Sequence, residues 1–438
     1  MAESDDAADQ PNPDDNPFKG TPLEQMFSAF TGGQMSGQFD LSQLMGQMQR
    51  MFEPHDGTVN FDMAKDVARH TVAAAGDDPT PGAHQQGAVS DAVRLAESWL
   101  DQVTGIPAGA TTIAAWSRAE WIENTAGTWT TLVEPIATHV VSAMSQAIPE
   151  EAKAMAGPLL GMLNQAGGAM FGQQIGRALG ELAGEVLSVA DIGIPLGPGR
   201  TAAVLPANIA AFGDGLGVSE SDVLLYVVLR ECAHQRLFAH SPWLRSALVT
   251  AIEEFGRGTT IDISAIESQL GGLDPSRPEQ IQEAMESGIF DPQRTPEQER
   301  ALERLESLLA FVEGWVDEVV SQATATTMPA ATALAEAMRR RRAVGGPAEQ
   351  TFASLVGLEL RPRRLREAAN LWAAVRDRRG TEARDLPWTH PDLMPTAADL
   401  DDPLGYASGE TSDDSDDFDA ALGRLLDGVP DTPPDDAE

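Results

Sequence analysis

Residues 222–245 read Asp-Val-Leu-Leu-Tyr-Val-Val-Leu-Arg-Glu-Cys-Ala-His-Gln-Arg-Leu-Phe-Ala-His-Ser-Pro-Trp-Leu-Arg, and this stretch decides the fold. Residues 219–222 carry short oxygen-bearing side chains that can cap a helix, and Pro242 ends a helix just after Ser241. The pattern therefore predicts a helix over 222–241. Because residues 223–229 are almost all apolar, we expect the helix to be largely buried.

Polar residues fill the second half of this helix, and buried polar groups need partners. The motif is Arg-Glu-x-x-His, with Arg230, Glu231 and His234. In His-Glu-x-x-His helices, two histidines one turn apart bind zinc and the glutamate is the general base. Arg230 stands at the position of the first histidine, and a guanidinium only donates hydrogen bonds. Spacing alone leaves two interpretations open, a degenerate metal site or a structural polar cluster.

Longer strings resemble the zincin-like metallopeptidase family of actinobacteria, also called zincin type 2 and formerly a domain of unknown function. The resemblance covers roughly residues 60–405. It rests on Arg-Glu-Cys-Ala-His-Gln-Arg-Leu-Phe (230–238), Pro-Trp-Leu-Arg (242–245), Phe-Val-Glu-Gly-Trp-Val-Asp (311–317), Arg-Arg-Arg-Arg-Ala-Val-Gly-Gly-Pro-Ala-Glu (339–349), Leu-Glu-Leu-Arg-Pro-Arg-Arg-Leu-Arg-Glu (358–367) and Trp-Thr-His-Pro-Asp-Leu (388–393).

This resemblance implies a mainly α fold with a small β-sheet (α+β), in which an edge strand lies beside the active-site helix. Some relatives carry the full His-Glu-x-x-His motif and a Glu-Gly-His string on a later helix, whose glutamate resembles the third zinc ligand. That glutamate corresponds to Glu313, on a helix expected over 297–322, and the residue after the glycine is Trp315. The implied roles are general base for Glu231 and zinc ligand for His234 and Glu313.

His240 is a further candidate ligand, because another zincin branch places a ligand six residues after the second histidine. That branch needs a glycine three residues after the histidine, and this chain has Leu237 there. In a zinc-dependent hydrolase, Arg230 or an arginine near it could stabilise the oxyanion that forms during the reaction.

Two functions follow. The first is a zinc-dependent metallopeptidase-like hydrolase that acts on a peptide or protein, with Zn²⁺ as cofactor. The alternative is a pseudoenzyme, in which Arg230 lies where zinc lies in relatives, Glu231 and Glu313 close around it, and the scaffold binds a peptide or protein without cleaving it.

The chain has 438 residues and a net charge of −37, of which −19 lies in its first 15 and last 40 residues. Charge and composition divide the chain into a disordered acidic arm (1–22), a Met- and Gly-rich helical arm (23–56), a body (57–400) and a disordered acidic tail (401–438). Net acidity argues against binding to nucleic acid or to an anionic membrane.

Cys232 is the single cysteine, which fits a reducing compartment. The first residues show no signal-peptide pattern, and no run of residues is apolar enough to span a bilayer. We therefore expect a cytoplasmic protein, with its oligomeric state left open.

Three other segments carry expectations. A glycine every fourth residue from Gly168 to Gly184 predicts a helix with a very closely packed partner. Residues 202–212 are expected to form a strand pair or one strand with an extended edge, and Pro206 favours an edge position. Residues 336–384 contain twelve arginines and six acids, so we expect arginines paired with acids of the body, or a docking surface for the acidic tail, a carboxylate or a phosphate.

Overall fold

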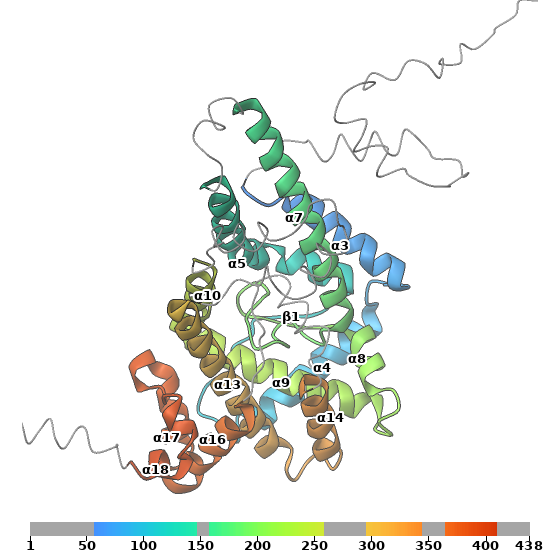
Figure 1. The fold of residues 1–438 in the computed structure, drawn as a ribbon. Helices are drawn as coiled ribbons and strands as arrows, with labels where there is room; N and C mark the ends of the chain where they lie inside the picture. The colour runs from blue at the N-terminus through green and yellow to red at the C-terminus, as the bar shows by residue number, and fades with distance from the viewer. Residues whose placement is uncertain (1–56, 147–156, 258–294, 344–363, 410–438) are drawn as a thin grey trace, which may run out of the picture. The chain divides into compact units, whose positions relative to one another are not determined.

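A computed structural model describes residues 57–146, 157–257, 295–343 and 364–409 (Figure 1). The two predicted N-terminal arms and most of the predicted acidic tail lie outside these residues. The described elements are α3 (Phe61–Ala75), α4 (Ala83–Leu100), β1 (Thr112–Ala115), α5 (Arg118–Gln146), α7 (Gly157–Glu185), β2 (Thr201–Val204), α8 (Pro206–Gly213), α9 (Glu220–His240), α10 (Pro242–Arg257), α13 (Pro296–Thr324), α14 (Ala331–Ala343), α16 (Leu365–Arg379), α17 (Thr381–Asp385), η1 (Leu386–Thr389), η2 (Pro391–Leu393), η3 (Ala398–Leu400) and α18 (Pro403–Ser408).

The fold is mainly α with one small sheet, as the resemblance implied. Strands β1 and β2 pair in parallel, with Thr112 opposite Thr201 and Ala115 opposite Val204. The expected strand over 202–212 is wrong beyond Val204, because Pro206 begins α8. Proline suits the first turn of a helix, where its missing N–H costs nothing.

In the described two-stranded sheet, β2 lies at an edge as expected, but its other side is covered. Residues 187–189 bond to its other side, through Val189 N to the Ala203 carbonyl at 2.9 Å and Leu205 N to the Leu187 carbonyl at 2.9 Å. The strand is fully buried and packs against α9. It therefore positions the loop after α7 close to the motif helix.

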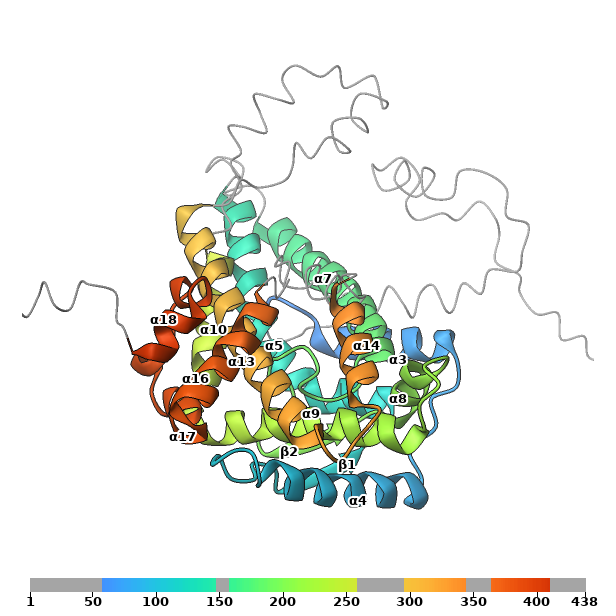
Figure 2. The same cartoon turned by 90° about the horizontal axis from the view of Figure 1, so that it is seen from below.

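Helix α9 is the element on which the site is built. The Ser219 side chain accepts from Asp222 N at 3.1 Å and caps its start, and α10 begins at Pro242, so α9 ends at His240. Its residues from Leu225 to Leu237 are all buried. Helices α4, α8 and α13 pack around it, as the view from below shows (Figure 2).

The glycine stripe on α7 packs against α3, which confirms the expected close partner (Figure 1). A Cβ on Gly172 would lie 2.5 Å from the Asn60 carbonyl oxygen, and a Cβ on Gly176 would lie 2.4 Å from that of Ala64. Only a residue without a side chain allows the two backbones to approach this closely.

At the C-terminal end, residues 403–408 form α18 on the surface of α16, although the sequence placed them in the disordered tail. The Asp402 side chain accepts from Gly405 N at 3.0 Å and caps the helix. Pro403 suits its first turn, and Ala407 is buried. Local capping and one buried contact thus extend the folded body past residue 400.

Candidate functional site

Two helices bring three of the candidate residues together. Arg230 and His234 lie one turn apart on α9, and Glu313 faces them from α13. Arg230 Nη2 donates to Glu313 Oε2 at 2.6 Å, and His234 Nε2 lies 3.0 Å from Glu313 Oε1. All three side chains are buried. The later glutamate therefore reaches the motif helix, as the resemblance implied.

Both ring nitrogens of His234 face oxygen atoms. Nδ1 lies 2.8 Å from the carbonyl oxygen of Arg230, and Nε2 faces Glu313. A carbonyl oxygen only accepts, so Nδ1 donates and Nε2 is directed at the carboxylate. In a metal-bound histidine, too, one ring nitrogen donates to a fixed acceptor while the other nitrogen is directed at the metal. The orientation of His234 thus suits an ion pair with Glu313 and a ligand role equally well.

Charge keeps Glu313 ionised. Burial acts to raise the pKa of Glu313, but Arg342, His234 and Arg230 outweigh burial and hold this pKa well below its ordinary value. Arg342 Nη1 donates to the same oxygen as Arg230. The carboxylate therefore lies between two guanidiniums and an imidazole.

The expectation that Glu231 closes around Arg230 together with Glu313 is wrong, because Arg230 bonds Glu313 and Asp317 while Glu231 bonds a different set of partners. Its Oε1 accepts from the Gln235 side-chain amide at 2.8 Å, and its Oε2 accepts from the backbone N–H of Ala190 at 3.1 Å. Burial raises the pKa of Glu231, and the charge of His234 only partly offsets this effect. Glu231 is thus a buried carboxyl beside the cluster, held by the loop that follows α7.

Arginines of α14 cover the cluster, and the loop after α7 takes part. Arg342 Nη2 donates to the Asp191 carbonyl oxygen at 2.9 Å, and Arg341 Nη1 donates to the Asp191 carboxylate at 2.9 Å. Gly193, at φ +77°, lies so close that a Cβ there would be 3.1 Å from Glu313 Oε1. Pairing of the arginine-rich segment with acids of the body was one of the two expectations from the sequence.

Asp191 was not among the sequence candidates. Burial would raise its pKa, yet Arg341 and Arg342 hold the pKa of Asp191 below its ordinary value. No motif surrounds it, and 150 residues separate it from Arg341. Its only signal was its position in the break between the glycine-rich helix and the strand.

His240 and Trp315 lie elsewhere. His240 is exposed, six residues beyond His234, and its Nδ1 faces the Arg236 carbonyl oxygen at 3.0 Å. Six residues turn a helix by about 240° and advance it by about 9 Å, so α9 cannot direct both histidines at one ion. Trp315 is buried and donates from Nε1 to Asp385 at 2.9 Å. Neither residue contributes to the cluster.

The residues present do not fit a zinc ion. Zinc needs about three protein ligands and an open position for water. His234 and Glu313 supply two, and the third position holds the Arg230 guanidinium, which is a cation without a lone pair. Among the residues that the structure describes, no three His, Cys, Asp or Glu side chains are grouped to hold a metal ion.

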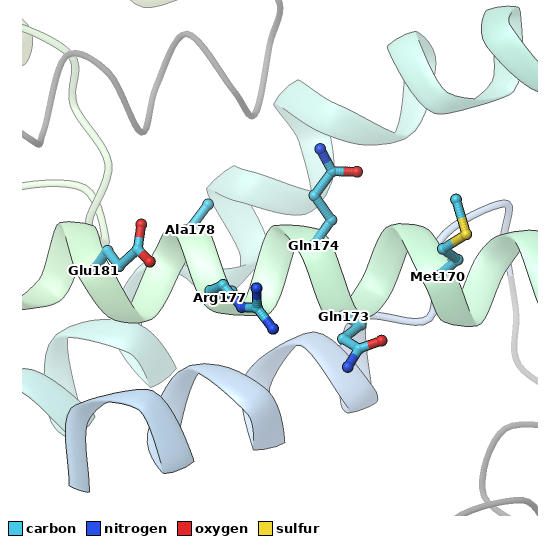
Figure 3. A pocket seen from close by; sticks show the side chains of 6 residues that line it. All are labelled: Met170, Gln173, Gln174, Arg177, Ala178 and Glu181. Atoms are coloured by element: carbon cyan, nitrogen blue, oxygen red, sulfur yellow. The ribbon is translucent and has the colours of Figure 1, made fainter. Parts of the chain in front are cut away.

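One surface hollow of about 300 Å³ lies on α7 and is separate from this cluster (Figure 3). Its described lining residues all belong to that helix and include none from α9 or α13. They are Met170, Gln173, Gln174, Arg177, Ala178 and Glu181.

Within the described part of the chain, no helix has the length and hydropathy of a membrane span.

The chain is similar to a solved structure and to one protein family. The structure is that of a provisionally assigned hydrolase with a novel fold from Chloroflexus aurantiacus; it is 21% identical, has a TM-score of 0.56 and matches 80% of this chain and 98% of that chain. At this identity the similarity shows the fold. No curated protein sequence matches significantly. A family model described as zincin-like metallopeptidase matches residues 59–407, and the chain therefore belongs to the zincin-like metallopeptidase family.

Proposed function

We propose that this chain is a metal-free zincin-like scaffold that binds a peptide or protein partner and does not hydrolyse it. The observation that carries the proposal is the contact of Arg230 Nη2 with Glu313 Oε2, at 2.6 Å. The Arg230 guanidinium lies at the first-ligand position of the zinc motif. It neutralises the Glu313 carboxylate, which resembles the last zinc ligand.

Electrostatics supports this interpretation. An arginine stays protonated at any physiological pH, so its charge cannot be removed to admit a metal. A divalent cation placed between His234 and Glu313 would also lie close to Arg342, whose Nη1 donates to Glu313. Like charges a few ångströms apart in a buried site repel by about several kcal/mol.

A zinc-dependent hydrolase is the second candidate, with Glu231 as base and His234 and Glu313 as ligands. The family and the orientation of His234 Nε2 towards Glu313 favour it. It requires a third donor where Arg230 now lies.

Metal content separates the two candidates. The full chain, purified from zinc-supplemented medium and dialysed, is expected to hold far less than one zinc per chain by elemental analysis. Chelator is expected to leave its Tm unchanged. The matched variant Arg230→His restores the missing donor and is expected to hold more zinc than the wild type. Near-stoichiometric zinc in the wild type, lost in His234→Ala, would overturn the proposal.

We further propose a cytoplasmic location, because the single thiol, Cys232, is buried and needs no oxidising compartment. The partner class proposed is protein or peptide, and neither nucleic acid nor an anionic membrane suits a chain of net charge −37.

A further inference from the structure

The C-terminal part of α14 supplies three guanidiniums to one side of the candidate site, those of Arg339, Arg341 and Arg342. Arg342 reaches Glu313 and the Asp191 carbonyl, and Arg341 reaches the Asp191 carboxylate and the Glu185 carbonyl at 2.5 Å. Arg339 Nη2 lies 3.2 Å from Asp317. We call Asp191, Glu313 and Asp317 the covered carboxylates. They come from a loop and from α13, so α14 bridges two separate parts of the body.

Apolar packing holds α14 only weakly. The large side chains that it buries are Leu334 and Met338, and the rest of its buried face is alanine. Burial of a large apolar side chain stabilises a helix in its place, and α14 has two such side chains. Helix α14 packs against α9 and α13, both of which are anchored by many other neighbours (Figure 2). Its ion pairs are therefore a large share of what keeps α14 in place.

Removal of α14 would change the charge of the site. Arg230 would remain on Glu313 and, at 3.4 Å, on Asp317. Asp191 would keep a backbone N–H donor, from Leu187 at 3.0 Å, but would lose its guanidinium. Among the described residues, the three carboxylates would then face Arg230 and His234 alone. Such a negatively charged surface favours a ligand that carries guanidinium groups in place of those of α14.

We propose that α14 is an autoinhibitory element, which occupies the binding face of the candidate site in the resting protein and is displaced by an arginine-bearing segment of a partner. This proposal rests on the proposed binding function and adds its regulation and ligand class. Arginine is required because Arg341 and Arg342 each bond a side-chain carboxylate and a backbone carbonyl at once. A lysine ammonium lacks this planar fork.

The test measures binding of a labelled peptide of residues 331–343 to the full chain by fluorescence anisotropy. The variant R339Q/R341Q/R342Q weakens the hold of the internal helix and leaves the covered carboxylates intact. We expect it to bind the peptide saturably, about tenfold or more tightly than the wild type, because occupancy by α14 lowers the apparent affinity of the wild type. R340Q is the matched control, since Arg340 is exposed and, among the described residues, pairs only with the exposed Glu336; it should bind as the wild type does.

Two further peptides address the strong negative charge of the chain. A scrambled peptide of the same composition and a peptide with lysine in place of arginine are both expected to bind more weakly. Asp191→Asn in the triple variant should weaken binding of the native peptide. Equal binding of native and scrambled peptides, or no effect of Asp191→Asn, would overturn the proposal.

A second variant protects the test if the triple variant does not fold. Leu334→Ala weakens the anchor of α14 and keeps every charge, and it should also bind the peptide more tightly than the wild type. If the folded variants bind no peptide while the wild type is free of zinc, autoinhibition is wrong and the scaffold proposal stands. Stoichiometric zinc would remove the scaffold proposal whatever the peptide does.

Discussion

Arg230 is a permanent cation buried between carboxylates. Its removal would leave those carboxylates without the positive charge that it supplies. We expect Arg230→Ala to lower the free energy of unfolding by about 3–5 kcal/mol, the usual cost of breaking a buried ion pair from one side. Urea unfolding of the full chain measures it. Arg340→Ala is the matched control, because the Arg340 side chain is 68% exposed, and we expect its effect to stay within about 0.5 kcal/mol.

The double variant Arg230→Ala/Glu313→Gln sharpens this prediction. Once the Glu313 charge is gone, loss of Arg230 leaves less buried charge unpaired. The double variant should therefore lose less unfolding free energy than the sum of the losses in the two single variants. Additive effects would show that Arg230 does not act through Glu313, and an Arg230→Ala variant as stable as Arg340→Ala would show that the guanidinium does not stabilise the fold.

Glu313 predicts a pH dependence. Because the pKa of Glu313 is lowered in the folded chain, its ionised form stabilises the fold fully above its ordinary pKa of 4.5. This stabilisation is lost as pH falls from there towards the folded pKa, by about 1.4 kcal/mol per pH unit. The stability difference between the wild type and Glu313→Gln should therefore be constant near neutral pH and shrink below about pH 4.5.

Urea unfolding of both proteins at several pH values checks this difference. The comparison cancels other acids, such as Asp191, that titrate in both proteins. A difference that stays constant down to about pH 3 would contradict a lowered pKa.

The sequence could identify Arg230, His234 and Glu313, because a helix period and a known family string place them. It could not identify Asp191 as the partner of Arg341 and Arg342. That contact joins a loop to a helix 150 residues later, and loops carry no periodic signal. The sequence also could not predict the orientation of the Trp315 side chain, because only the packing of the fold shows that its ring points to Asp385.

Among the elements, α7 and α3 show how a poor helix former is retained. A Cβ on Gly176 would lie 2.4 Å from the Ala64 carbonyl oxygen and 2.7 Å from Val67 Cβ. We expect Gly176→Ala to destabilise the chain by about 1–3 kcal/mol, because backbone has to shift. Gly184→Ala is the control on the same helix, since no described atom apart from the neighbouring backbone of α7 lies within 4 Å of its new Cβ. It should be neutral or stabilise by up to about 1 kcal/mol.

Thermal and urea unfolding of the two variants measure this contrast. Equal effects would mean that helix propensity, and not the contact with α3, governs the stripe. The four-residue glycine period was a sufficient signal for this close packing. The strand expected over 202–212 failed for a local reason, because β propensity could not decide whether Pro206 lies in a strand or begins a helix.

Across the whole molecule, the family explains the fold better than it explains the chemistry. The family model and the structural neighbour both extend over most of the chain, and α9 and α13 meet as the motif required. The residue at the first-ligand position departs from that motif. A fold can be retained while its site changes, and the proposed scaffold is one such case.

Asp385 joins parts of the body that are distant in the sequence, so we expect its loss to affect the stability of the whole fold. Its carboxylate accepts from Thr104 Oγ1 at 2.6 Å, Trp315 Nε1 at 2.9 Å and Arg384 Nε at 2.8 Å, so it links the segment after α4, helix α13 and helix α17. We expect Asp385→Ala to lower the free energy of unfolding by about 3–5 kcal/mol, because it strands buried donors and an arginine.

Hydrogen exchange shows whether this loss is shared between the joined parts. In Asp385→Ala, amides at Thr104–Ile106 and in α17 should both exchange faster, although 281 residues separate Thr104 from Asp385. Asp392→Ala is the control, because the Asp392 side chain is 86% exposed and, within the described part of the chain, pairs only with the exposed His390. It should leave both segments unchanged. Faster exchange in α17 alone would mean that the carboxylate serves its own helix and does not hold the two parts together.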